Sequence, residues 1–251
     1  MSELRTERIA SFDEVELAVH EMGEGKPVVL VHGLFSSANM NWIKFGHAQK
    51  LVEAGFRVIM LDLRAHGDSA APHSSEAYPE GVLSRDLAAL VEHYGLTNYD
   101  LVGFSLGSRT SARAVIDGLT PRKLVLSGMG LEGLAGWANR AAFFIDAIDR
   151  FDEVKRGDPA FMAKSFMKTM DVDRVAARQL LLAVDDTEAE ELSAITMPTM
   201  VLCGADDRDN GSAPDLAAKL PMGEYTEIPG THMSSVAEAA MGDALVQFLE
   251  G

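Results

Sequence analysis

The sequence predicts an α/β protein built on one mostly parallel sheet of eight strands, with helices on both of its faces. Short runs rich in Val, Ile and Leu alternate with amphipathic helical stretches over most of the chain. Several of these runs are apolar throughout, which is typical of strands that a parallel sheet buries on both sides. One long, purely helical stretch interrupts the alternation at about residues 131–191.

The first strands have two different patterns. The segments "TERIASF" and "EVELAVHEMG" alternate polar and apolar residues, which predicts two half-buried strands joined by a turn around Asp13. The next run, "KPVVLVHG", is continuously apolar and ends in glycine, so it is expected to be a strand in the sheet interior. A helix near 43–54 and the strand "FRVIMLDL" follow it.

The alternation continues with a helix near 82–94, the strand "YDLVGF", a helix over 107–118 and the strand "KLVLSGM". After the long helical stretch, strands return as "MPTMVLCG" and "EYTEIPG", and an amphipathic helix in "SSVAEAAMGDALVQFLEG" closes the chain. We therefore expect a core domain of residues 1–130 and 192–251, with residues 131–191 inserted in it as a helical cap.

The composition narrows the classes of partner. The chain has 251 residues, of which 47% are hydrophobic, so it can bury a sizeable core. Its 38 acidic and 22 basic residues give a net charge of -16, which disfavours nucleic acid and anionic membrane surfaces as partners. A single cysteine, Cys203, and a charged first segment predict a cytoplasmic protein without a membrane span. The composition leaves a homodimer open.

The pentapeptide "GFSLG" places Ser105 at the junction of a predicted buried strand and a predicted helix. A sharp turn there would expose the serine above the carboxyl edge of the sheet, and side chains at Gly103 and Gly107 would collide across it. The free N–H of Leu106, at the start of the helix, would face negative charge that forms beside Ser105. We interpret Ser105 as a nucleophile.

A serine hydroxyl needs a base and an orienting acid, which follow it along the chain in the order Ser, acid, His in this topology. His232 is the only histidine after Ser105, and it lies in a loop between the last strand and the last helix. The acid is expected in "MVLCGADDRDNG", where Asp206, Asp207 and Asp209 are the candidates.

The segments "VVLVHG", "LDLRAHGDS", "GFSLG", "GADD" and "PGTHM" together resemble the α/β-hydrolase superfamily, in particular its cap-bearing serine esterase and lipase-like branch. This resemblance covers nearly the whole chain and implies an α/β-hydrolase fold without a cofactor. It implies Asp207, three residues after Gly204, as the acid, with Asp206 as the alternative. It also implies an oxyanion hole formed by the backbone N–H groups of Leu34 and Leu106.

Three further patterns have structural interpretations. His32 precedes the nucleophile, where the family keeps a histidine that shapes a loop. "LDLRAHGDS" groups Asp62, Arg64, His66 and Asp68 but has no metal-ligand spacing, so we expect no metal. "GMGLEG" at 128–133 matches a dinucleotide fingerprint, but about 60 helical residues follow where a strand within roughly 30 is typical. Its glycines are interpreted as a flexible exit into the cap.

The resemblance predicts hydrolysis of carboxylic esters of small, largely apolar substrates through an acyl-enzyme. Apolar cap residues are expected to fill the cap core and in part to face the substrate; they are Trp137, Phe143, Phe144, Phe151, Phe161, Met162, Phe166, Met167 and Met170. Carbon–carbon bond hydrolysis, lactone hydrolysis and perhydrolysis use the same triad and stay open, as does a slow-turnover ligand sensor. Two residues depart from the family pattern and bear on the choice of subfamily. Ser108 lies where a second glycine often follows the turn that bears the nucleophile, and Phe35 lies where perhydrolase-like members tend to have proline.

Overall fold

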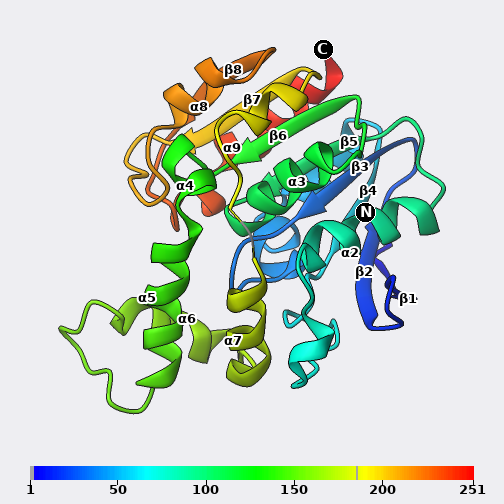
Figure 1. The fold of residues 1–251 in the computed structure, drawn as a ribbon. Coiled ribbons are helices and arrows are strands. Elements are labelled where there is room, and N and C mark those ends of the chain that lie inside the picture. The colour runs from blue at the N-terminus through cyan, green and yellow to red at the C-terminus, as the bar shows by residue number, and fades with distance from the viewer. Residues whose placement is uncertain (1–2, 185) are drawn as a thin grey trace.

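A computed structural model describes residues 3–184 and 186–251 and contains one eight-stranded sheet (Figure 1). The strand order is β1-β2-β4-β3-β5-β6-β7-β8, with β2 antiparallel to both β1 and β4 and every other neighbouring pair parallel. The predicted fold class is therefore confirmed. The strands are β1 (Arg5–Ala10), β2 (Glu16–Met22), β3 (Lys26–Val31), β4 (Phe56–Leu61), β5 (Asp100–Phe104), β6 (Lys123–Ser127), β7 (Thr199–Gly204) and β8 (Gly223–Ile228).

Helices cover both faces of this sheet. The helices α1 (His47–Glu53) and α9 (Ala239–Glu250) pack together on one face, and α2 (Val82–His93), α3 (Leu106–Ile116) and α8 (Ala213–Lys219) contribute to the core on the other. The central strands serve both layers. On β3, for example, Val29 and Val31 belong to the core beneath α2 and α3, whereas Val28 and Leu30 belong to the core beneath α1 and α9. This two-sided burial explains why the central strands are apolar throughout.

The segment after β3 differs from the single helix expected near 43–54. It forms a short π-helical turn, η1 (Asn39–Ile43), and then α1, which starts only at His47. Gly46 separates them because its φ of 80° is left-handed and cannot continue a helix. Trp42 is fully buried in η1 and anchors this turn against the core beneath α1 and α9.

Between β6 and β7 the described residues form helices and no strand. They are α4 (Leu131–Ala135), α5 (Trp137–Asp149), α6 (Phe161–Thr169), α7 (Arg174–Ala183) and the short 3₁₀ helix η3 (Glu191–Ala194). In Figure 1, α5, α6 and α7 stand apart from the sheet layers, whereas α4 lies beside α8. The outgoing and returning chains are tied together where they pass each other, because the N–H of Thr187 donates to the carbonyl of Leu134 at 3.0 Å. Among the described residues, no helix is long and apolar enough to cross a membrane.

Candidate active site

Ser105 lies in a strained turn between β5 and α3. Its φ of 54° and ψ of -115° are backbone angles that residues with a side chain rarely adopt. A Cβ atom on Gly103 would lie 2.4 Å from the backbone of Gly107, and one on Gly107 would lie 2.1 Å from the carbonyl oxygen of Val31. Both glycines are therefore required by close backbone packing, as the sequence predicted. This packing holds Ser105 in the strained conformation at the carboxyl end of β5.

The carbonyl oxygen of Ser127, at the end of β6, fixes the turn further. It accepts hydrogen bonds from the N–H of Ser105 at 2.8 Å and from the hydroxyl of Ser108 at 2.7 Å. Ser108 occupies the position where the family often has a second glycine. Its side chain is fully buried, so the serine both fits and adds a hydrogen bond that a glycine could not make.

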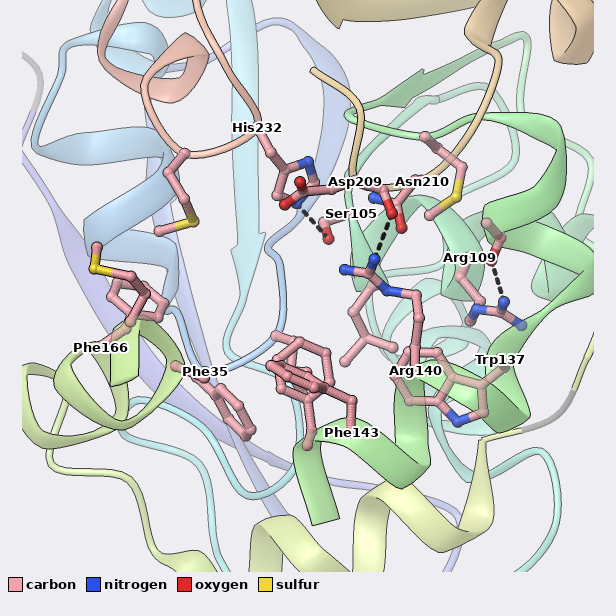
Figure 2. Close-up of a pocket in the computed structure, with 18 of the residues that line it drawn as sticks. Phe35, Ser105, Arg109, Trp137, Arg140, Phe143, Phe166, Asp209, Asn210 and His232 are labelled. Atoms are coloured by element: carbon pink, nitrogen blue, oxygen red, sulfur yellow. Dashed lines mark hydrogen bonds between the residues drawn. The ribbon is translucent and has the colours of Figure 1, made fainter. Parts of the chain in front are cut away.

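His232 lies between Ser105 and Asp207. Its Nε2 is 3.0 Å from the Oγ of Ser105 (Figure 2). Its Nδ1 is 2.9 Å from the Oδ2 of Asp207. The neutral tautomer that fits both contacts carries its proton on Nδ1 and donates it to Asp207, which leaves Nε2 to accept the serine proton. All three side chains are at most about a tenth exposed. The arrangement can move a proton from the serine hydroxyl to the imidazole.

Of the three candidate acids, only Asp207 contacts His232. A tight turn, in which the N–H of Asp207 donates to the carbonyl of Gly204 at 2.9 Å, directs its side chain inward. Asp206 and Asp209 are exposed. Burial by itself would raise the pKa of Asp207, but the hydrogen bond and charge of His232 and the N–H of Asp209 hold that pKa below its ordinary value. The carboxylate therefore stays ionised beside the imidazole.

The His232 ring is fixed by close packing. It lies over Phe104, with ring centroids 5.1 Å apart. A Cβ atom on Gly128 would be 2.8 Å from the Phe104 ring and 3.1 Å from the Cε1 of His232. The glycine that follows β6 thus leaves room for both rings.

The glycines of "GMGLEG" are required by the loop that bears the acid. A Cβ on Gly130 would lie 2.4 Å from the backbone of Gly211, and one on Gly133 would lie 2.7 Å from the Cβ of Asn210. The side-chain amide of Asn210 donates to the carbonyl of Gly128 at 2.7 Å. These contacts explain the fingerprint match by close packing, and the segment is tied to its neighbour more firmly than the expected flexible exit.

The predicted oxyanion donors, Leu34 and Leu106, both line the cavity that contains Ser105. Neither backbone N–H donates to any acceptor in the described part of the chain. Phe35, next to Leu34, has a left-handed φ of 57°, and its own N–H donates to the Nε2 of His66 at 2.9 Å. The turn is thereby held so that the amide of Leu34 is left for an incoming acceptor.

Two neutral histidines support this loop. His32 accepts from the N–H of Leu63 at 3.0 Å and donates from Nδ1 to the carbonyl of Gly33 at 2.8 Å. His66 donates from Nδ1 to the carbonyl of Arg64 at 2.9 Å. Burial lowers the pKa of both, and that of His66 falls to about 3. Their geometry is that of loop supports rather than of catalytic bases.

Asp62 clamps the loops around these histidines. Its carboxylate accepts from the N–H groups of Ala38 at 2.7 Å and Asp68 at 2.9 Å, and it lies 3.1 Å from the Nε2 of His20. The ligand atoms of His20, Asp62 and Asp68 lie within 4.8 Å of one another, as in a metal site. Because both Asp62 oxygens already accept backbone donors, hydrogen bonding accounts for this cluster. Arg64, from the same segment, donates from Nε to the carboxylate of Asp86 at 3.0 Å.

A cavity of about 840 Å³ opens beside Ser105 and His232. Its walls are largely apolar and come in part from the helices between β6 and β7, which contribute Trp137, Phe143, Phe144, Met162 and Phe166. The other apolar residues noted in that segment do not line it; Met167, for example, is buried in the core. A smaller chamber of about 120 Å³ also borders Ser105 and His232 and is lined by Met40, Phe45 and Val236. The serine therefore has room for a substrate group on each of two sides.

Two polar residues of the large cavity were not expected from the sequence. Arg109, on the buried face of α3, donates to the carbonyl of Gly133 and lies 5.0 Å from the Trp137 ring. Its signal was an arginine one turn after the nucleophile on a helix expected to be buried. Arg140, on α5, donates to the backbone carbonyl of Asp209 (Figure 2). No sequence pattern distinguished it from the other charged residues of the segment.

Comparisons with known proteins agree with the fold described above. A family model described as the alpha/beta hydrolase fold matches residues 26–153, just over half of the chain. The chain is 27% identical over 222 residues to the AB hydrolase superfamily protein YisY of Bacillus subtilis, and 28% identical over 231 residues to a non-heme haloperoxidase of Rhodococcus erythropolis. Each match covers 80% of this chain and 81% of the relative. The solved esterase of Exiguobacterium antarcticum shares the fold with a TM-score of 0.78 at 20% identity, over 98% of this chain and all of the other.

Proposed function

The chain belongs to the α/β-hydrolase fold family, and from that premise we propose that it is a serine hydrolase that cleaves carboxylic esters through an acyl-enzyme. The assignment to a hydrolase family follows from the family match. The ester substrate, the catalytic roles of the three polar residues and the cap role of residues 131–191 are the proposal.

In this reaction the Oγ of Ser105 attacks the ester carbonyl while His232 takes the hydroxyl proton on Nε2. Asp207 holds the tautomer and stabilises the imidazolium that forms. The carbonyl oxygen becomes an alkoxide and accepts hydrogen bonds from the amides of Leu34 and Leu106. His232 returns its proton to the leaving alcohol, the Ser105 acyl ester remains, and water activated by His232 releases the carboxylic acid.

The observation that carries the proposal is the continuous hydrogen-bonded chain from Asp207 through His232 to Ser105, with contacts of 2.9 Å and 3.0 Å. It ends on a serine held in a strained turn beside an apolar cavity. The two backbone amides without an acceptor provide the site for the developing negative charge.

Turnover of short-chain 4-nitrophenyl esters tests the proposal. We expect Ser105→Ala to lower kcat by at least about a thousandfold, because the nucleophile is lost. Ser111→Ala is the matched control: it lies on the same helix, is buried, and its hydroxyl has no partner among the described residues. A fluorophosphonate should label Ser105 in the wild-type protein by mass spectrometry. Unchanged turnover in Ser105→Ala would refute the proposal.

The haloperoxidase relative favours one second activity, perhydrolysis, in which hydrogen peroxide replaces water at the acyl-enzyme. The products would be a peracid and the free Ser105 hydroxyl. Perhydrolase-like members of the family tend to have proline where this chain has Phe35. Here the N–H of Phe35 donates to His66 beside the oxyanion loop, and proline could not make this bond because it has no N–H. A peracid-dependent bromination assay with acetate and peroxide, compared with ester hydrolysis, distinguishes the two activities.

A further inference from the structure

An arginine projects into the largely apolar cavity beside the proposed nucleophile. Arg140 is half-buried on α5 and lines the same cavity as Ser105. Figure 2 shows its side chain reaching from α5 toward the loop that bears Asp209. The Nη1 group donates to the backbone carbonyl of Asp209, and the guanidinium lies 5.7 Å from the ring centroid of Phe144.

Most of the hydrogen-bonding capacity of this guanidinium is unused. It carries several N–H donors and donates only one of them within the described chain. No carboxylate of a described residue lies within ion-pair distance of it. Burial lowers the pKa of Arg140, whereas the charges of Asp209 and Asp207 raise it, and the group stays protonated. Pairing with an anion stabilises a partly desolvated cation of this kind.

The other two arginines that line the cavity contact different groups of the protein. Arg109 is almost fully buried, donates to the carbonyl of Gly133 and packs against the Trp137 ring. Arg208 is exposed at the rim, and its Nη1 is shared between the carbonyls of Ala205 and Asp207. Arg140 is therefore the cation placed to meet a bound molecule.

We propose that Arg140 is a specificity-determining residue that binds a carboxylate at the far end of the substrate's acyl chain. The inference rests on the proposed function and narrows it to half-esters of dicarboxylic acids, in place of the uncharged esters expected from the apolar cap. The guanidinium presents parallel N–H groups that match the two oxygens of a carboxylate. Trp137, Phe143 and Phe144 provide apolar surface for the chain between the two ends. A carboxylate on the acyl side stays bound during both acylation and deacylation.

A matched pair of substrates tests this inference: the 4-nitrophenyl half-ester of adipic acid and 4-nitrophenyl hexanoate. They have the same leaving group and acyl carbon count and differ in a terminal carboxylate. We expect Arg140→Met to lower kcat/KM for the adipate half-ester about 10- to 100-fold and for the hexanoate by less than about 3-fold. Arg140→Lys should recover part of the loss, because it keeps the charge without the planar fork.

Arg156→Met is the control for net charge, since Arg156 is exposed between α5 and α6 and does not line the cavity. It should leave the ratio of the two kcat/KM values unchanged. An equal loss for both substrates in Arg140→Met would overturn the inference, because Arg140 would then only brace the Asp209 loop. If Arg140→Met changes kcat/KM for neither substrate, the inference is overturned as well.

A binding measurement keeps this inference separate from the proposed reaction. Calorimetry of the Ser105→Ala protein with monomethyl adipate should give a Kd at least about tenfold tighter than that of the Ser105→Ala, Arg140→Met double variant. Equal affinities would overturn the role of Arg140 whatever the chemistry at Ser105. Conversely, ester turnover that persists in Ser105→Ala would overturn the proposed function and leave the affinity comparison valid.

Discussion

At the scale of single residues, chain order selected His232 and the family resemblance selected Asp207 among three neighbouring acids, and the structure brings both together with Ser105. His232 is the only histidine after Ser105, and the turn after β7 directs only one of three neighbouring acids inward. Arg140 could not be selected in the same way. Its importance depends on how α5 sits over the cavity, which involves contacts between residues about seventy positions apart.

The selection of Asp207 over its neighbour is directly testable. Asp207→Asn should lower kcat for 4-nitrophenyl esters by about 10⁴, because an amide no longer holds the tautomer and charge that His232 needs. Asp206→Asn, at the exposed neighbour, should change kcat by less than a few-fold. Steady-state kinetics of both purified variants provide the comparison. Similar losses in the two would show that the loop as a whole, and not the carboxylate at 207, supports turnover.

At the scale of elements, the sequence predicted the strands and most helices because burial on two faces leaves a clear apolar pattern. It did not predict the break at Gly46, since helical segments lie on both sides of it. It also did not predict the clamps between loops. Asp62, for example, joins the segment before η1 to the turn after β4 through hydrogen bonds to backbone N–H groups, which carry no sequence signature.

A buried ion pair joins α2 to the loop after β4. Arg64 is fully buried and contacts Asp86 at 2.6 Å and Asp13 at 2.7 Å, and Ser11 donates a hydrogen bond to Asp86. Burial raises the pKa of Asp86 even with this partner. Arg64 therefore compensates a carboxylate that has lost its water.

Arg64→Met should lower the free energy of unfolding by about 3 to 5 kcal/mol, because it leaves the buried charge of Asp86 without its cationic partner. Removing the acid as well, in Arg64→Met with Asp86→Leu, should restore part of that loss. Arg113→Met, at a more exposed arginine paired with Asp117, should cost at most about 1 kcal/mol. Urea unfolding at neutral pH measures all three. A double variant less stable than Arg64→Met would contradict the buried-charge explanation.

At the scale of the whole molecule, the core contains histidines that folding keeps neutral. Burial lowers the pKa of His32, His47 and His66. His20 behaves oppositely, because its hydrogen bond to Asp62 raises its pKa. The three histidines with lowered pKa values bind protons more readily in the unfolded chain than in the folded one. They therefore destabilise the fold as the pH falls below the ordinary pKa of histidine. His20 contributes its stabilisation at low pH and loses it as the pH rises.

Substitution of His66 alone tests how a buried histidine makes the free energy of unfolding depend on pH. The pKa of His66 falls from an ordinary value of 6.5 to about 3 on folding, so its contribution to stability is complete above about pH 6.5 and is lost as the pH falls toward about 3. Glutamine at this position can accept from Phe35 and donate to Arg64 without titrating. His66→Gln should therefore be less stable than wild type at about pH 7, and the gap should narrow by up to about 1.4 kcal/mol per pH unit through this window.

Urea unfolding of both proteins at about pH 7 and about pH 4.5 measures the gap, and the other titrating groups cancel in the difference. If the gap for His66→Gln stays constant, the imidazole of His66 takes up its proton in the native protein as readily as in the unfolded chain. The support of the Leu34 turn would then not depend on a neutral ring, because a protonated Nε2 cannot accept the N–H of Phe35.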